Sequence, residues 1–171
     1  MGARGIAAII WAVALLPLPA AAQVGAWQLD GTVSTRGFAK DEFEHGAVLG
    51  IFEDGTYVTG GSLMCGAACE VGTWRREGDE LELIPSNESD IALEVTKCLF
   101  GNDFIRRPNA RLRTYFHVAS VGPDGTLVMK SKARAQARFV FGWRSVKARG
   151  TSVATPTTQA DLDRWVGDCT F

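Results

Sequence analysis

The sequence contains little histidine and no glycine loop of the kind that cradles phosphate, and both absences bear on catalysis. His45 and His117 are the only imidazole bases, and neither lies in a nucleophile elbow or a metal-binding helix motif. Gly60-Gly61 and Gly66 lack the following Lys and helix of a phosphate-binding loop. These absences favour a non-catalytic protein and leave an enzyme as the third hypothesis, and we expect no catalytic residue, no cofactor and no metal site.

Long apolar stretches are absent after residue 22, whereas residues 1–22 have the pattern of a secretory signal peptide. Arg4 supplies a positive start, residues 6–16 are apolar, and small residues at 20–22 offer a cleavage site. The apolar run is shorter than the roughly 20 residues that span a bilayer. We expect cleavage to release a single domain of residues 23–171 into the periplasm or the extracellular space, with no transmembrane segment.

Proline is scarce, with 6 residues against 19 glycines, which is typical of strands joined by tight turns rather than of a disordered chain. Asp54-Gly55 and Asp124-Gly125 each stand between apolar β-formers. Such a pair is a strong hairpin signal, because glycine tolerates the positive φ of a tight turn. A third short hairpin is expected at residues 77–79.

About eight or nine short strands at regular spacing predict an all-β fold. We expect an antiparallel up-and-down meander that closes into an eight-stranded barrel, because closure removes exposed strand edges. One strand is expected over residues 91–100, where apolar and more polar residues alternate. Only the end of the chain has a helical pattern, with Thr155 as N-cap and a short helix over residues 156–166.

Four cysteines, Cys65, Cys69, Cys98 and Cys169, follow the signal peptide. An even set in an oxidising compartment predicts two disulfides, each stabilising by roughly 2–4 kcal/mol. Either Cys65 or Cys69 joins Cys98 while Cys169 ties down the tail, or Cys65 pairs with Cys69 and Cys98 with Cys169. Met64, Cys65 and Cys69 could instead offer soft ligands to copper or zinc, but their spacing is looser than Cys-x-x-Cys.

Positive charge is scarce in residues 23–105 and abundant in residues 106–150. The first segment has 15 acidic and 5 basic residues, and the second has 1 acidic and 11 basic residues. The two halves can pair their charges across neighbouring strands. Alternatively, the basic stretch 106–138 forms a face for anionic lipid, glycan or nucleic acid, and the lack of interleaved aromatics and of a nucleic-acid motif argues against nucleic acid. The residues of this stretch are Arg106, Arg107, Arg111, Arg113, Lys130, Lys132, Arg134 and Arg138.

The first expected strand opens with Gly25-Ala26-Trp27, which resembles the Gly-x-Trp opening of lipocalin-like proteins. The resemblance implies that Trp27 closes one end of a barrel and is covered by an arginine from the last strand. Arg144 or Arg149 would take that part by cation–π stacking. The C-terminal helix also suits this plan.

The stretch between Cys65 and Cys98 is similar to small periplasmic β domains of the META type. It contains a Gly-x-Trp and, at its end, Thr96-Lys97-Cys98. Both resemblances imply a small exported β-barrel.

The barrel and the basic stretch suggest two functions. In the first, the protein holds a small apolar or amphipathic ligand in a lipocalin-like barrel. In the second, it is an envelope interaction or assembly module whose basic stretch meets an anionic envelope component. The expected ligand contacts are Tyr57, Tyr115, Phe116, His117, Phe139 and Phe141. Simple core packing is the alternative role for Tyr57, Phe116, Phe139 and Phe141, and a satisfied edge histidine is the alternative for His117.

Overall fold

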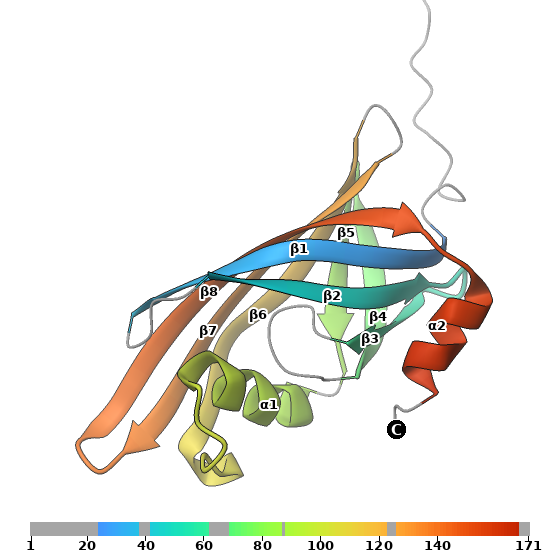
Figure 1. Ribbon diagram of the computed structural model, residues 1–171. Helices are drawn as coiled ribbons and strands as arrows, with labels where there is room; N and C mark the ends of the chain where they lie inside the picture. Colours follow the sequence, from blue (N-terminus) through green and yellow to red (C-terminus); the bar gives the residue numbers. More distant parts are fainter. Residues whose placement is uncertain (1–23, 38–41, 62–68, 87, 123–125, 168–171) are drawn as a thin grey trace, which may run out of the picture.

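The computed structural model describes residues 24–37, 42–61, 69–86, 88–122 and 126–167. Eight antiparallel strands follow one another around a closed barrel in chain order (Figure 1). This confirms the predicted all-β meander. The strands are β1 (Gly25–Gly37), β2 (Glu42–Ile51), β3 (Thr56–Gly61), β4 (Glu70–Glu77), β5 (Glu80–Pro85), β6 (Ala110–Val121), β7 (Leu127–Phe139) and β8 (Gly142–Pro156). The helices are α1 (Glu88–Phe100), the 3-10 turn η2 (Arg107–Asn109) and α2 (Gln159–Val166).

Tight turns join the neighbouring strands where the sequence predicts them. Gly55 has φ +85° between β2 and β3, and Gly78 has φ +63° between β4 and β5. Both values lie in the left-handed region that glycine tolerates best. Gly125 lies outside the described residues, but Val121 of β6 pairs with Leu127 of β7 across its turn. The paired hairpins therefore belong to one continuous meander.

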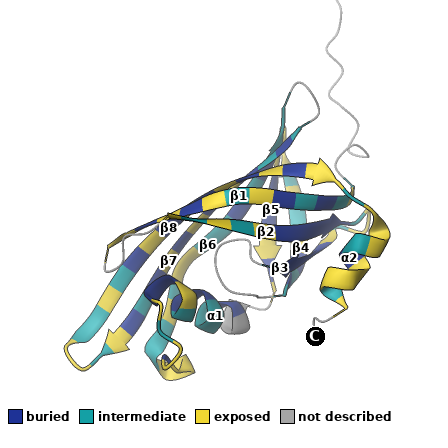
Figure 2. Cartoon of the chain, in the orientation of Figure 1, coloured by how far each residue is buried: buried dark blue, intermediate teal, exposed yellow. Residues whose placement is uncertain are grey.

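Burial alternates clearly along β7 and β8, whereas residues 47–51 of β2 and 57–60 of β3 are buried without alternation (Figure 2). Trp27, Leu49 and Met129 belong to an apolar cluster inside the barrel, and Val33, Ile91 and Val146 belong to a second one beside α1. A third, smaller cluster lies under α2. Apolar side chains thus pack both in the part of the barrel around Trp27 and in the part beside α1.

Residues 88–100 form a helix, so the strand predicted over residues 91–100 is wrong. Ile91, Val95 and Leu99 are buried and stand four residues apart, whereas Leu93 is only partly buried. Positions four apart share a face in both a helix and a strand, which is why alternation alone did not separate the two. Small alanines on the inward faces of β7 and β8 let α1 pack against them; they are Ala133, Ala135, Ala137 and Ala148.

The C-terminal helix is confirmed, but it starts later than predicted. Its N-cap is Thr158, whose hydroxyl accepts a hydrogen bond from the Asp161 N–H at 3.1 Å, and β8 continues through Pro156. Leu162 packs on Val48 and Val58 outside the barrel. None of the described helices is both long and apolar enough to cross a membrane.

Cys69 and Cys98 are not free thiols; both are disulfide-bonded. The other two cysteines, Cys65 and Cys169, lie outside the described residues. The connectivity therefore stays a prediction.

Candidate functional site

A carboxylate lies inside the barrel. Glu70, the first residue of β4, is 1% exposed. It accepts hydrogen bonds from the phenols of Tyr57 and Tyr115, each at 2.6 Å. The His117 Nε2 atom lies 3.6 Å from Glu70 Oε2, an ion-pair distance that is too long for a hydrogen bond. We call Tyr57, Glu70, Tyr115, His117 and Ser131 the Glu70 cluster.

Four strands build the Glu70 cluster. Tyr115 and His117 are two residues apart on β6, so both point inward, and their rings meet edge to face at 4.6 Å. Ser131 faces His117 from β7, with its hydroxyl 2.6 Å from Nδ1. Tyr57 comes from β3. The interior of the barrel therefore contains a connected polar group as well as apolar clusters.

Burial and charge act against each other on Glu70. Burial raises the pKa of its carboxyl, but the positive charge that His117 carries when protonated, together with hydrogen bonds from the cluster, lowers it by more. The net pKa lies below the ordinary value of 4.5. Burial, followed by the charge of Glu70 and the hydrogen bond to it, raises the pKa of Tyr57 and of Tyr115 far above 10.0. The carboxylate is charged at neutral pH while both phenols keep their protons.

Ser131, His117 and Glu70 have the order of a nucleophile, a base and an acid. However, their exposed fractions are 2%, 0% and 1%, so a substrate has no route to the Ser131 hydroxyl in this conformation. Within the described residues there is also no group of three or more metal-ligating side chains. The Glu70 cluster is therefore better explained as a buried polar support of the barrel than as a reaction centre.

The outer surface of β1, β8 and β7 carries a second group, which is positively charged. Arg36, Lys147 and Arg134 lie directly opposite one another across the three strands. Arg149 and Lys132 form the next such row on β8 and β7. All alternate with buried neighbours, so they point away from the interior. We define the basic face as Arg36, Lys130, Lys132, Arg134, Lys147 and Arg149.

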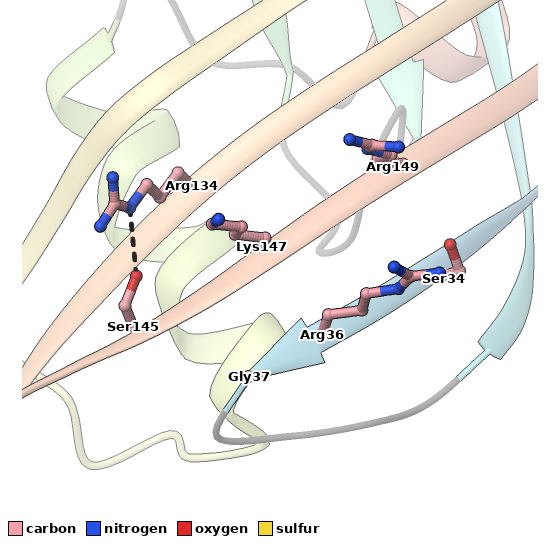
Figure 3. Close-up of a pocket in the computed structure, with 7 residues that line it drawn as sticks. All are labelled: Ser34, Arg36, Gly37, Arg134, Ser145, Lys147 and Arg149. Atoms are coloured by element: carbon pink, nitrogen blue, oxygen red, sulfur yellow. Dashed lines mark hydrogen bonds between the residues drawn. The ribbon is translucent and has the colours of Figure 1, made fainter.

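A pocket of about 510 Å³ lies within the basic face (Figure 3). Three neighbouring strands contribute its side chains, and four of them are cationic. Ser145 accepts a hydrogen bond from Arg134 Nε at 3.3 Å. The lining residues are Ser34, Arg36, Gly37, Arg134, Ser145, Lys147 and Arg149. The pocket offers several N–H donors and hydroxyls to one bound group.

Carboxylates do not balance the basic face within the described part of the chain. The ion pairs found there involve Arg75, Lys97, His117 and Arg164, none of which belongs to this face. Like charges that stand directly opposite each other on paired strands destabilise a sheet. The fold thus holds these cations together at an electrostatic cost.

Two aromatic rings lie among the cations of this side of the barrel. Lys132 stands over the Phe116 ring at 5.2 Å, and Arg111 over the Trp143 ring at 4.3 Å. Both contacts have cation–π geometry. Aromatics are therefore interleaved with the basic residues, contrary to the expectation from the sequence. The register of β6 against β7 shifts between Leu112 and Thr114.

The six expected ligand contacts do not line one cavity. Tyr57, Tyr115 and His117 meet in the Glu70 cluster, whereas Phe116 faces outward with Lys132. Phe139 packs against Phe100 of α1, with ring centroids 5.7 Å apart. Phe141 is exposed at the turn between β7 and β8. Only half of the predicted set therefore lies together inside the barrel.

Trp27 is buried inside the barrel and pairs with Pro156 of β8, whereas Arg144 lies near the start of that strand. Roughly 40 Å of extended strand separates the two positions on β8. Arg149 belongs to the outer basic face. The strand register therefore places neither arginine beside Trp27.

Sequence reasoning did not identify Glu70, Arg36 or Lys147 as site residues, and it considered Arg149 only as a cover for Trp27. Glu70 is one of many acidic residues in its half of the chain, and no local pattern marks it as buried. The basic face requires β1 to pair with β8, residues more than a hundred positions apart. The alternation of β8 indicates that Lys147 and Arg149 share a face, but not that Arg36 joins them.

Comparison with known proteins assigns no family. No protein-family model matches the chain. No curated protein sequence shows a significant match to it either.

Proposed function

We propose that the protein is a non-catalytic binding module that holds an anionic partner on its basic face. One observation carries the proposal. Cations stand directly opposite one another on β1, β8 and β7, with no carboxylate partner in the described residues. A bound anion would remove the repulsion that this arrangement creates.

The spacing of the cations suits a partner with several oxyanion groups. Neighbouring strands lie about 4.8 Å apart, and alternate residues on one strand lie roughly 6.7 Å apart. Arg36, Arg134 and Arg149 can each bind two oxygens of a phosphate in parallel, and Lys147 adds a mobile point charge. Phosphate groups, from a free polymer or from lipid headgroups, match this chemistry.

The barrel interior supports ligand binding less well. The phenols of Tyr57 and Tyr115 are bonded to Glu70, and His117 faces the same carboxylate. A small apolar ligand would have to replace these bonds. A lipocalin-like carrier therefore remains the alternative proposal, supported by the eight-stranded meander. Export to the periplasm or the cell exterior is part of both proposals and rests on residues 1–22.

Binding of inorganic polyphosphate to the mature protein tests the proposal. The double variant Lys147→Glu/Arg149→Glu reverses two charges of the basic face. The matched control Arg75→Glu/Arg164→Glu makes the same change in net charge on β4 and α2, which lie elsewhere. We expect tight, salt-sensitive binding by the wild type and the control, with a loss of at least tenfold in the double variant.

Two outcomes would count against the basic face. Equal weakening in both variants would mean that only net charge matters. Unchanged affinity in Lys147→Glu/Arg149→Glu would mean that the face is not the binding site. Circular dichroism spectra and melting temperatures of both variants control for loss of the fold.

A further inference from the structure

Two large apolar side chains stand exposed at the turn of the β7–β8 hairpin. Val140 is 95% exposed and Phe141 is 87% exposed. They form the two-residue connection between Phe139 and Gly142, which pair with each other. Turns of this kind usually carry polar residues and glycine. These two side chains add nothing to the described core, so their apolar character needs another explanation.

The position of this turn is well defined. Phe139, at its base, packs on Phe100 at the end of α1, with ring centroids 5.7 Å apart. Gly142 has φ +100°, which allows the chain to reverse tightly. β7 and β8 are long strands, and their hairpin extends to one end of the molecule (Figure 1). The apolar turn is therefore held outward by ordered structure.

Another exposed aromatic is Phe104, which is 85% exposed and belongs to the connection between α1 and η2. This connection lies at the same end of the molecule as the β7–β8 turn (Figure 1). This connection follows Phe100, which contacts the base of the hairpin. We define the apolar tip as Phe104, Val140 and Phe141.

Cations stand directly behind the apolar tip. Arg138 and Arg144 are exposed and lie within three residues of the turn on either strand. Arg111 stacks on Trp143, which faces Arg138 across the hairpin. The one acidic residue beside Phe104 is Asp103, whose backbone carbonyl accepts a hydrogen bond from Arg106. Arg138 shares its face of β7 with Lys132 and Arg134 of the basic face, whereas Arg144 pairs with buried Ala137 and lies on the other face of the hairpin.

We propose that the anionic partner is a lipid membrane, with the apolar tip inserted among the lipids and the basic face against their phosphate headgroups. This inference rests on the proposed function and names its partner. Interfacial binding places apolar side chains roughly 5–10 Å into the headgroup region, with cations at the level of the phosphates. About 20 Å of extended strand separates Phe141 from Lys147, so the tip and the basic face reach these two levels together when the β7–β8 hairpin lies along the membrane surface.

A membrane explains both features, whereas a soluble polyanion explains only one. Free polyphosphate would engage the cations but would leave Val140 and Phe141 in water. Neither a few apolar side chains nor a basic patch holds a protein firmly on a bilayer alone, and the two together do. Each cation near an anionic surface adds about fivefold to the affinity. Insertion of one aromatic side chain adds roughly tenfold or more.

Vesicle co-flotation of the mature protein tests the inference. The vesicles contain phosphatidylcholine alone or a mixture with phosphatidylglycerol, and polyphosphate affinity is measured in parallel. Phe141→Asp removes the insertion of the apolar tip. Ile84→Asp is the matched control, because Ile84 is an exposed apolar residue on β5. We expect wild type and Ile84→Asp to float only with anionic vesicles, and Phe141→Asp to lose at least tenfold in partitioning with unchanged polyphosphate affinity.

The conservative variant Phe141→Trp should float like the wild type, and its fluorescence should shift to the blue on anionic vesicles. Equal flotation of Phe141→Asp and wild type would overturn insertion of the tip. Polyphosphate binding without vesicle binding would overturn the lipid assignment and leave the proposed function standing. A dimer in solution that Phe141→Asp converts to a monomer, without vesicle binding, would assign the tip to self-association. If Lys147→Glu/Arg149→Glu binds both polyphosphate and anionic vesicles as well as the wild type does, the proposed function itself is wrong.

Discussion

Glu70 keeps a negative charge inside the barrel because its neighbours replace the water that burial removes. Two phenols donate to its oxygens, and His117 stands at ion-pair distance. Removing one member of such a buried group leaves the others without partners, which costs more than the intact group contributes. The cluster therefore joins β3, β4, β6 and β7 through one residue.

Glu70→Gln should lower the free energy of unfolding by about 3 kcal/mol or more, because the two phenols donate to different oxygens of Glu70 and the amide replaces one of those acceptors with a donor. Denaturant titration followed by circular dichroism measures this change. Glu82→Gln is the matched control, since Glu82 makes an exposed ion pair with Arg75 and should cost less than about 1 kcal/mol. Equal stability of the two variants would contradict the supporting role of Glu70.

The pKa shifts of the Glu70 cluster predict how stability depends on pH. Glu70 has a lowered pKa in the folded state. Its contribution to the free energy of unfolding is therefore complete above pH 4.5 and is lost as the pH falls through the folded-state pKa. Tyr57 and Tyr115 have raised pKa values in the folded state. Their contribution to the free energy of unfolding is therefore complete below pH 10.0 and is lost as the pH rises further. A plot of melting temperature against pH should show a plateau that falls at acidic pH and again at alkaline pH. Glu70→Gln should make the fall at acidic pH shallower, and an unchanged fall would exclude Glu70 as a source of it.

At the scale of elements, the hairpins were predictable and the first helix was not. Asp54-Gly55 and Gly78 mark turns through local chemistry, because glycine tolerates the positive φ found there. Residues 91–100 alternate like a strand, yet they pack as a helix on the inward face of β6, β7 and β8. Only the small alanines of distant strands create the space for that helix, and local periodicity does not contain this information.

Substitutions in α1 distinguish the helix from a strand. Ile91→Ala should reduce the free energy of unfolding by about 2–5 kcal/mol, because Ile91 is fully buried. Leu93→Ala should cost less than half as much, since Leu93 is only partly buried. An alternating strand would bury both side chains on the same face. Equal losses in a denaturant titration would therefore favour the strand that the sequence suggested.

Closure of the barrel creates the arrangement of charge at the scale of the whole molecule. It places β1 beside β8, so that Arg36, from the acidic half of the sequence, joins Lys147 and Arg134 from the basic half. A concentration of positive charge after residue 105 was visible in the sequence. The rows of cations depend on how β1 pairs with β8 and β8 with β7, and composition does not contain this pairing. The same register separates Arg144 from Trp27.

Anion binding at the basic face is tested most directly by a nuclear magnetic resonance titration of the ¹⁵N-labelled mature protein with inorganic polyphosphate. Binding at the basic face should shift the backbone amides of Ser34, Arg36, Ser145, Lys147 and Arg149, which line its pocket. The chemical shifts of the backbone amides of the Glu70 cluster, inside the barrel, should not change. Shifts concentrated at Tyr57, Tyr115 and His117, with the basic face unchanged, would contradict the account and favour a ligand inside the barrel.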